Sequence, residues 1–288
     1  MISNNITRSR SFVIIAAHYV VATLIGWLAY RSAMYCLADS MWALFVADAI
    51  ATIYIWVLGL VYRNVSFYDP YWSVAPPVML TAWAAHCGHP TAATLILLAA
   101  LWFWALRLTY NWAVTFRGMA HEDWRYAKFR TQCHPLVFHL INFFGLNMVP
   151  TVVVFLAMIP AFHTIGAHAP ATPLTIVGGI ATAGAVVLQM VSDSQSHRFR
   201  AQHPGQVCNV GLWRHGRHPN YLGEILVWWG VWIIELSHTG WAAQGWHIAG
   251  PLAVTLLFCT VSIPLMEQRQ LATKPQYAEY RRHTRLFI

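Results

Sequence analysis

Runs of apolar residues about as long as a bilayer is thick limit the fold of this chain more than any other feature. Crossing the hydrocarbon core takes a helix of about 20 such residues. Six long runs and two shorter ones lie, in chain order, at roughly 12–30, 41–62, 68–85, 91–113, 138–160, 172–192, 219–236 and 247–265. We therefore expect an all-α integral membrane protein, a bundle of about eight transmembrane helices.

The positive charges predict the orientation of this bundle. With eight crossings and a cytoplasmic N-terminus, every Lys and Arg except Arg31 falls in a cytoplasmic segment. Short loops rich in Lys and Arg remain on the cytoplasmic side of a membrane, so both termini are expected there. The same rule accounts for the net charge of +8, and no nucleic-acid partner is predicted.

Composition and motifs exclude several other kinds of protein. Only 10% of the residues are charged, against about 25% in soluble domains, so we expect one transmembrane domain over residues 1–288. The five cysteines have neither metal nor redox spacing. No His-Glu-x-x-His set, P-loop or dinucleotide fingerprint occurs, so no metal and no Rossmann fold are predicted.

The segment 213–224 holds the densest group of cationic side chains. Its sequence is Trp-Arg-His-Gly-Arg-His-Pro-Asn-Tyr-Leu-Gly-Glu. Pro219 predicts a helix start with His218 as its cap, and a helix start favours an anion. Arg214, His215 and Arg217 reinforce that preference, so the segment predicts an anion-binding pocket at the membrane surface. Contact with lipid headgroups is the alternative.

Polar side chains continue from this segment into the apolar run. Asn220 and Glu224 are four residues apart and share one helix face. Side chains of this kind are costly in a membrane unless they have partners. We therefore expect them to face a cavity or other polar groups.

Two further segments carry polar groups at the cytoplasmic ends of apolar runs. Asp69 lies between Tyr68 and Tyr71, either as the cap of a helix beginning at Pro70 or as an acid that faces a cavity. Arg107 either extends to the interface or faces a cavity on the same helix face as Asn111, one residue beyond Tyr110.

Further polar residues lie just after the apolar run at 172–192 and in the C-terminal tail. Asp193, His197 and Arg200 share one helix face, and a surface ion pair is the alternative explanation for them. The basic, aromatic tail that contains Tyr280 and Arg281 either folds over a nucleotide or lies on anionic lipid.

These residues together resemble the steroid 5α-reductase superfamily, and its bacterial membrane branch most closely. The resemblance rests on Asp193, Arg200 and His203-Pro-Gly205, on Gly211 to Glu224, and on the Tyr-x-x-Tyr-x-Arg tail. It covers roughly 185–288 well and 60–130 less well. Residues 1–65 are then variable N-terminal helices, and 66–288 form a reductase-like core.

The resemblance implies NADPH as cofactor and reduction of an activated carbon–carbon double bond in a lipophilic, steroid- or isoprenoid-like substrate. Such a substrate would arrive from the bilayer, and membrane lipids would be the other partners. The implied cofactor residues are Arg107, Asp193, Arg200, Arg214, Arg217, His218, Asn220, Tyr221, Glu224 and Tyr280.

The catalytic assignment is less direct, because Trp104 stands where the family has its tyrosine. Tyr68, Tyr71 or Tyr110 would then supply the phenol, and Asp69 would stand in for the family's glutamate. A phenol paired with Asp69 would hydrogen-bond the substrate carbonyl and stabilise the enolate that forms. The expected location is the bacterial inner membrane, with the active site facing the cytoplasm.

Two other functions stay open. Arg-His-Pro-x-Tyr also resembles an element of isoprenylcysteine carboxyl methyltransferases and related phospholipid methyltransferases, where it helps to bind S-adenosylmethionine. A lipid-binding protein that keeps the fold without the chemistry is the third alternative.

Overall fold

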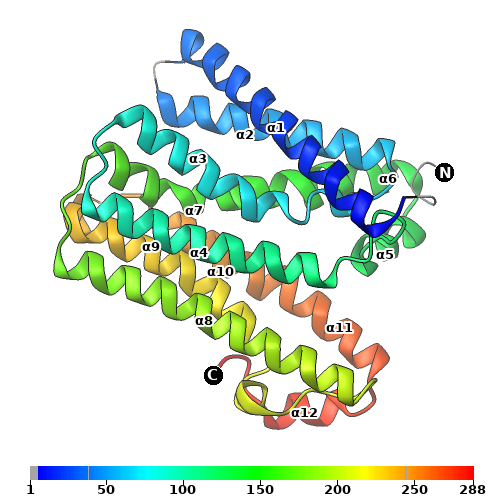
Figure 1. Cartoon of the computed structure of the whole chain (residues 1–288). Helices are drawn as coiled ribbons and strands as arrows, with labels where there is room; N and C mark the ends of the chain where they lie inside the picture. Colours follow the sequence, from blue (N-terminus) through cyan, green and yellow to red (C-terminus); the bar gives the residue numbers. More distant parts are fainter. Residues whose placement is uncertain (1–5, 38, 244) are drawn as a thin grey trace. The chain divides into compact units, whose positions relative to one another are not determined.

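A computed structural model of the chain describes residues 6–37, 39–243 and 245–288. These residues form helices and no strand, as the apolar runs predict (Figure 1). The elements are α1 (Arg8–Cys36), α2 (Ser40–Val61), η2 (Val65–Phe67), α3 (Tyr71–Cys87), α4 (Ala92–Thr115), α5 (Trp124–Gln132), α6 (Pro135–Leu140), η3 (Ile141–Met148), α7 (Val149–Gly166), α8 (Pro173–Gln202), η4 (Gly211–Arg214), α9 (Pro219–Ala243), α10 (Ala249–Leu257), η5 (Phe258–Ser262), α11 (Ile263–Thr273) and α12 (Tyr277–His283).

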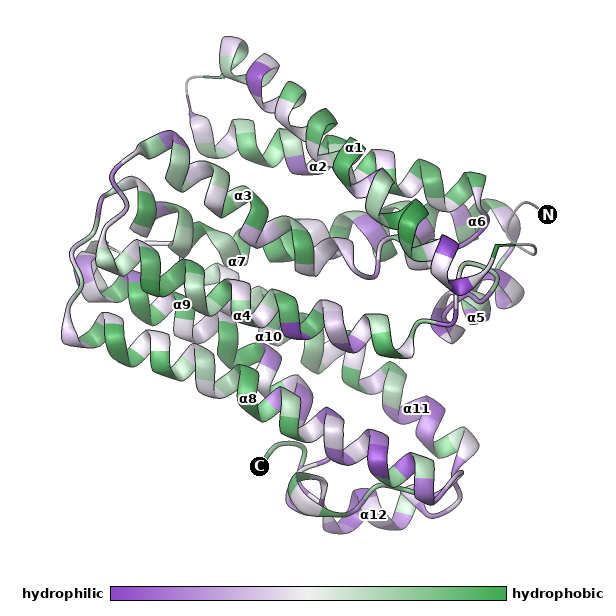
Figure 2. Cartoon of the chain, in the orientation of Figure 1, coloured by the Kyte–Doolittle hydropathy of each residue, from purple (hydrophilic) through white to green (hydrophobic). Residues whose placement is uncertain are grey.

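Six helical stretches among the described residues are long and apolar enough to cross a membrane. Figure 2 shows hydrophilic residues concentrated on α5, on α12 and in the last turns of α8. The six stretches are Arg8–Cys36, Ser40–Val61, Ala92–Thr115, Pro135–Gly166, Pro173–Gln202 and Ala249–Thr273.

The chain divides into two compact units. Unit 1 comprises residues 1–79 and 108–155, and unit 2 comprises 80–107 and 156–288. In unit 1, α1 and α2 lie side by side. Its buried core contains Ile15, Ile55, Phe67 and Met119. The Asn64 side chain donates to the Met119 carbonyl at 2.8 Å, so the loop after α2 is held against the segment that precedes α5.

Unit 2 is built around the antiparallel pair α8 and α9, which are in contact over most of their length (Figure 1). Glycines allow this contact. A Cβ at Gly178 would lie 2.9 Å from the Gly230 carbonyl oxygen, and one at Gly223 would lie 2.8 Å from the Ala185 carbonyl oxygen. Small residues of this kind let backbones approach closely in membrane helices, where van der Waals contact drives association.

This packing predicts different effects on stability for two glycine-to-alanine substitutions. A Cβ at Gly230 would lie 2.2 Å from the Thr182 hydroxyl and 2.9 Å from its backbone nitrogen. We expect Gly230→Ala to lower the free energy of unfolding by about 1–3 kcal/mol. At Gly184 of α8 nothing lies within 4 Å of an added Cβ, so Gly184→Ala is neutral or stabilises by up to about 1 kcal/mol. Thermal unfolding in detergent measures both, and equal effects would contradict the packing argument.

Candidate functional site

Two hydrogen-bonded pairs of polar side chains join α8 to α9 where the helices pack together. Gln189 Nε2 donates to the Glu224 carboxylate at 3.0 Å. One turn further along each helix, Asn220 Nδ2 donates to the Asp193 carboxylate at 3.1 Å. The expectation that Asn220 and Glu224 share one face and meet polar partners is confirmed. The partners are themselves an i, i+4 pair, because the two helices are antiparallel.

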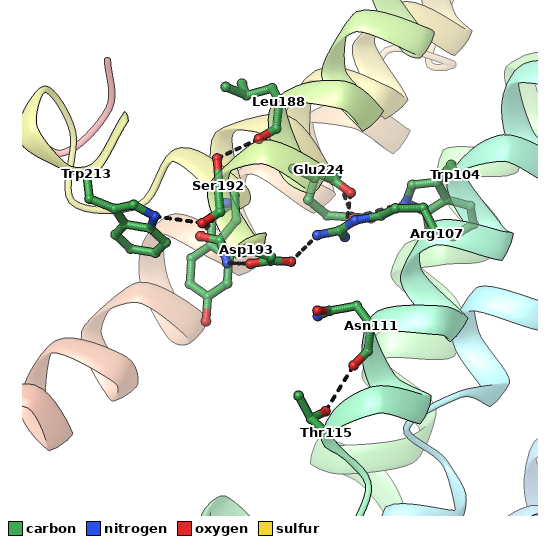
Figure 3. Close-up of polar contacts among 12 residues, drawn as sticks. Trp104, Arg107, Asn111, Thr115, Leu188, Ser192, Asp193, Trp213 and Glu224 are labelled. Carbon is green, nitrogen blue, oxygen red and sulfur yellow. Dashed lines mark hydrogen bonds and ion pairs between the residues drawn. The ribbon is translucent and has the colours of Figure 1, made fainter. Parts of the chain in front are cut away.

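Helix α4 contributes a cation and an indole to the same group. The Arg107 guanidinium donates to Gln189 Oε1 at 2.7 Å and forms an ion pair with Asp193. One turn earlier, Trp104 Nε1 lies 3.0 and 3.1 Å from the two oxygens of Glu224. Figure 3 shows Arg107 extending from α4 toward Asp193 and Trp104 directed at Glu224. We call Arg107, Gln189, Asp193, Asn220 and Glu224 the polar network.

The polar network is largely shielded from solvent. Gln189 is fully buried and Glu224 is 4% exposed, and the Arg107 side chain is 7% exposed. Removing one partner from a buried ion pair costs about 3–5 kcal/mol, so the loss of either Arg107 or Asp193 would destabilise the protein. It sets two carboxylates against one guanidinium, which leaves room for one further proton or cation. The Asp193 side chain is 15% exposed, so solvent reaches it more easily than the Arg107 side chain.

The segment 211–218 is fixed against α8. Gln195 accepts a hydrogen bond from the Leu212 backbone N–H at 2.9 Å. The Trp213 indole donates to the Ser192 carbonyl at 2.8 Å (Figure 3). Gly211 has a φ of +56°, and a Cβ there would lie 2.5 Å from the Gln195 side chain. The segment therefore reaches α9 along a path that only glycine permits.

The C-terminal tail holds the other side of this segment. Gly216 forms a parallel bridge with Arg285. The Tyr280 hydroxyl donates to the Trp213 carbonyl at 2.5 Å. Arg217 Nε donates to Glu267 at 2.8 Å, and its Nη1 donates to the Thr284 carbonyl at 2.5 Å. Arg217 and Tyr280, both predicted to contact the cofactor, thus join the loop to the tail.

His218 has a similar internal role. The helix begins at Pro219 as predicted, with Leu222 N–H donating to the His218 carbonyl at 3.0 Å. The His218 Nε2 atom lies 3.2 Å from Glu267 Oε1, and the imidazole ring stacks on the Tyr221 ring with centroids 5.4 Å apart. Burial lowers the pKa of His218, although the Glu267 hydrogen bond and charge oppose this. The imidazole is therefore largely neutral at pH 7 and adds no charge to an anion site.

Three other cations lie together beside the loop. Burial raises the pKa of Cys208, while the charges of Arg200 and Lys274 oppose that rise. The pKa of Lys274 is lowered by burial and by the charges of Arg200 and Arg269. We call Arg200, Arg269 and Lys274 the cation cluster. Arg200 is exposed, and so is Arg214 in the loop, so both are available to an anionic ligand.

In unit 1, the partner of Asp69 is a tyrosine that the sequence analysis did not assign. Tyr126 of α5 donates to the Asp69 carboxylate, and the Arg125 guanidinium lies 3.9 Å from it. Burial raises the pKa of Asp69 to about 6, although Arg125 and the Tyr126 hydrogen bond oppose the rise. Burial and the Asp69 charge also raise the pKa of Tyr126. The pair can therefore hold a proton near neutral pH.

The three tyrosines predicted for this role lie elsewhere. The Tyr68 hydroxyl contacts Thr151 at 2.7 Å. Tyr71 donates to the Asp48 carboxylate at 2.8 Å. Tyr110 is 71% exposed on α4. The phenol that contacts Asp69 is therefore Tyr126 and not Tyr68, Tyr71 or Tyr110.

Some of the missed residues carried a signal in the sequence. Gln189 is a polar residue in an apolar run, four positions before Asp193, and that spacing could have placed it on the same face. Glu267 and Tyr126 lie 50 and 57 positions from the groups they contact, and no local spacing identifies such pairs.

One comparison with known proteins identifies a family. The model of a family described as "Protein of unknown function (DUF1295)" matches residues 55–284. The match covers most of the chain, and the chain belongs to this family. No curated protein and no solved structure matches it.

The raised pKa of Asp69 predicts a pH dependence of stability. An unfolded Asp has a pKa near 3.9, so between about pH 4 and 6 the folded protein holds a proton that the unfolded chain has released. Stability therefore falls as pH rises through this range, by up to about 3 kcal/mol, and is then level. Thermal unfolding against pH should show this slope for the wild type and lose it in Asp69→Asn.

A matched control for this experiment is Glu279→Gln, because the Glu279 side chain is 66% exposed. It should leave the slope between pH 4 and 6 unchanged. A slope that persists in Asp69→Asn would show that another group binds the proton.

Proposed function

We propose that this member of the DUF1295 family is a membrane-embedded, NADPH-dependent reductase of an activated carbon–carbon double bond in a lipophilic substrate. The polar network is the observation that carries the proposal. Ionisable side chains within membrane helices are costly and mark functional sites, and here three helices direct them at one another. The resemblance of Asp193, Arg200 and Asn220 to the cofactor residues of steroid 5α-reductases supports NADPH as the ligand.

The cofactor's phosphates suit the cation cluster and Arg214. Arg200 and Lys274 are close enough for their charges to affect each other and Cys208, and charge-assisted hydrogen bonds to phosphate are among the strongest available. Asp193 and Asn220 would orient the ribose or nicotinamide end. In this proposal Arg217, His218 and Tyr280 position the loop through Glu267 and the tail.

When bound, NADPH would supply a hydride to the β-carbon of the substrate. In unit 1, Asp69 holds the Tyr126 phenol in place, and a phenol held in this way is the kind of hydrogen-bond donor that such a reduction requires. A donor aimed at the oxygen that gains negative charge lowers the barrier. A proton from solvent would complete the product.

The finer topology is part of the proposal. Eight crossings require α3 and α9 to span the membrane together with the six longer stretches. Both termini then lie in the cytoplasm, as the Lys and Arg distribution favours. The protein would reside in a bacterial inner membrane with segment 211–218 and the cation cluster facing the cytoplasm.

Ligand-dependent unfolding tests the cofactor. A ligand at 100 times its dissociation constant stabilises a protein by about 2.7 kcal/mol. We expect NADPH to raise the unfolding temperature in detergent and S-adenosylmethionine to leave it unchanged. Arg200→Gln should weaken NADPH binding about ten- to hundredfold, because one charge-assisted hydrogen bond contributes about 1.5–3 kcal/mol.

Arg198→Gln is the matched control, since Arg198 is also exposed on α8 but points away from the Arg200 face. It should bind NADPH like the wild type, whereas Asp193→Asn should bind it more weakly. Stabilisation by S-adenosylmethionine alone would replace the proposal with methyl transfer. Stabilisation by neither ligand would favour a lipid-binding protein.

Native cysteines test the topology. Cys36 at the end of α1 is exposed, and Cys133 at the end of α5 is partly exposed. In intact cells a membrane-impermeant maleimide should label a variant that retains only Cys36. A variant that retains only Cys133 should be labelled only after permeabilisation. The reverse pattern would invert the orientation, and equal labelling of both sites in intact cells would contradict the proposed crossings.

A further inference from the structure

Three potential metal ligands converge in unit 2, away from the polar network. They are His163 of α7, Glu235 of α9 and His247, which precedes α10. One ligand atom from each lies within 4.8 Å of the other two. His247 Nδ1 is 2.6 Å from Glu235 Oε1, and the two imidazole rings stack with centroids 4.3 Å apart and an angle of 22° between their planes.

The group combines a buried carboxylate with two imidazole rings. Glu235 is fully buried, and a carboxylate without water is costly unless cations or donors surround it. The ring nitrogens of His163 and His247 approach this carboxylate, and His247 Nδ1 contacts it directly. A neutral imidazole is the form that binds metal ions.

We propose that His163, Glu235 and His247 bind a divalent transition-metal ion, with Zn²⁺ the best match. Two imidazoles and one carboxylate form a known zinc ligand set, and three protein ligands leave a fourth position for water or another oxygen ligand. The ion would place positive charge beside the buried Glu235 carboxylate, and it would join α7 and α9 to the segment before α10.

This site is distinct from the polar network. Glu235 is eleven residues beyond Glu224 on α9, which corresponds to about 16 Å along a helix axis. The proposal therefore does not depend on the proposed reductase function. The three ligands come from three separate elements, which is why no ligand motif appears in the sequence.

The test uses the full chain in detergent with any affinity tag removed, treated with EDTA and desalted. We expect one Co²⁺ per chain, with the visible absorption of a four- or five-coordinate ion, and displacement of that ion by Zn²⁺. Zn²⁺ should also raise the unfolding temperature. Glu235→Gln and His247→Gln should weaken Zn²⁺ binding by about a hundredfold or more.

His168→Asn is the matched control, because His168 is exposed and has a φ of +48°, which Asn tolerates. It should bind both metals like the wild type. Should Glu235→Gln fail to fold, the variants His163→Gln and His247→Gln at partly buried positions and the wild-type Co²⁺ spectrum still decide the matter. A wild type that takes up no Co²⁺ or Zn²⁺, or binding that survives all three ligand substitutions, overturns the proposal and leaves a Glu–His hydrogen bond that fastens the loop.

Discussion

Without side chains at Gly223 and Gly230, α9 lies so close to α8 that an added Cβ at either position would overlap its neighbour. That spacing allows the short amide of Gln189 to reach Glu224 and the Asn220 amide to reach Asp193. In water the hydrophobic effect would hold such helices together, whereas in lipid the contact depends on fit and on the hydrogen bonds it permits. Backbone packing and the polar network therefore stabilise each other.

The loop before α9 shows how one carboxylate can organise a basic segment. Glu267 contacts Arg217, His218 and Arg281. Of the four basic side chains at 214–218, Arg217 and His218 contact Glu267 within the protein, whereas Arg214 and His215 are exposed, as Arg200 is on α8. The loop is consequently shaped by its internal ion pairs, and recognition of an anion falls to fewer residues than the sequence suggests.

The sequence predicted well what depends on neighbours along the chain. Apolar runs predicted the helices, Pro219 predicted where α9 begins, and the four-residue spacing predicted the shared face of Asn220 and Glu224. The predictions from sequence were wrong where tertiary structure decides which side chains are in contact. Tyr68 and Tyr71 flank Asp69 in sequence, but a backbone beginning a helix directs them to Thr151 and Asp48, and Tyr126 from α5 takes the contact.

The bridge between Gly216 and Arg285 has a consequence for biosynthesis. The backbone N–H groups of Arg217 and His218 donate to the Arg285 and Leu286 carbonyls. The loop before α9 therefore cannot reach its final conformation until the segment about 70 residues further along the chain has been synthesised. At about 5–20 residues per second, synthesis of that stretch takes roughly 4–14 seconds. During that interval α8 and α9 can already be inserted and paired while the loop between them is still open. The pair α8 and α9 can thus form before the loop between them reaches its final conformation.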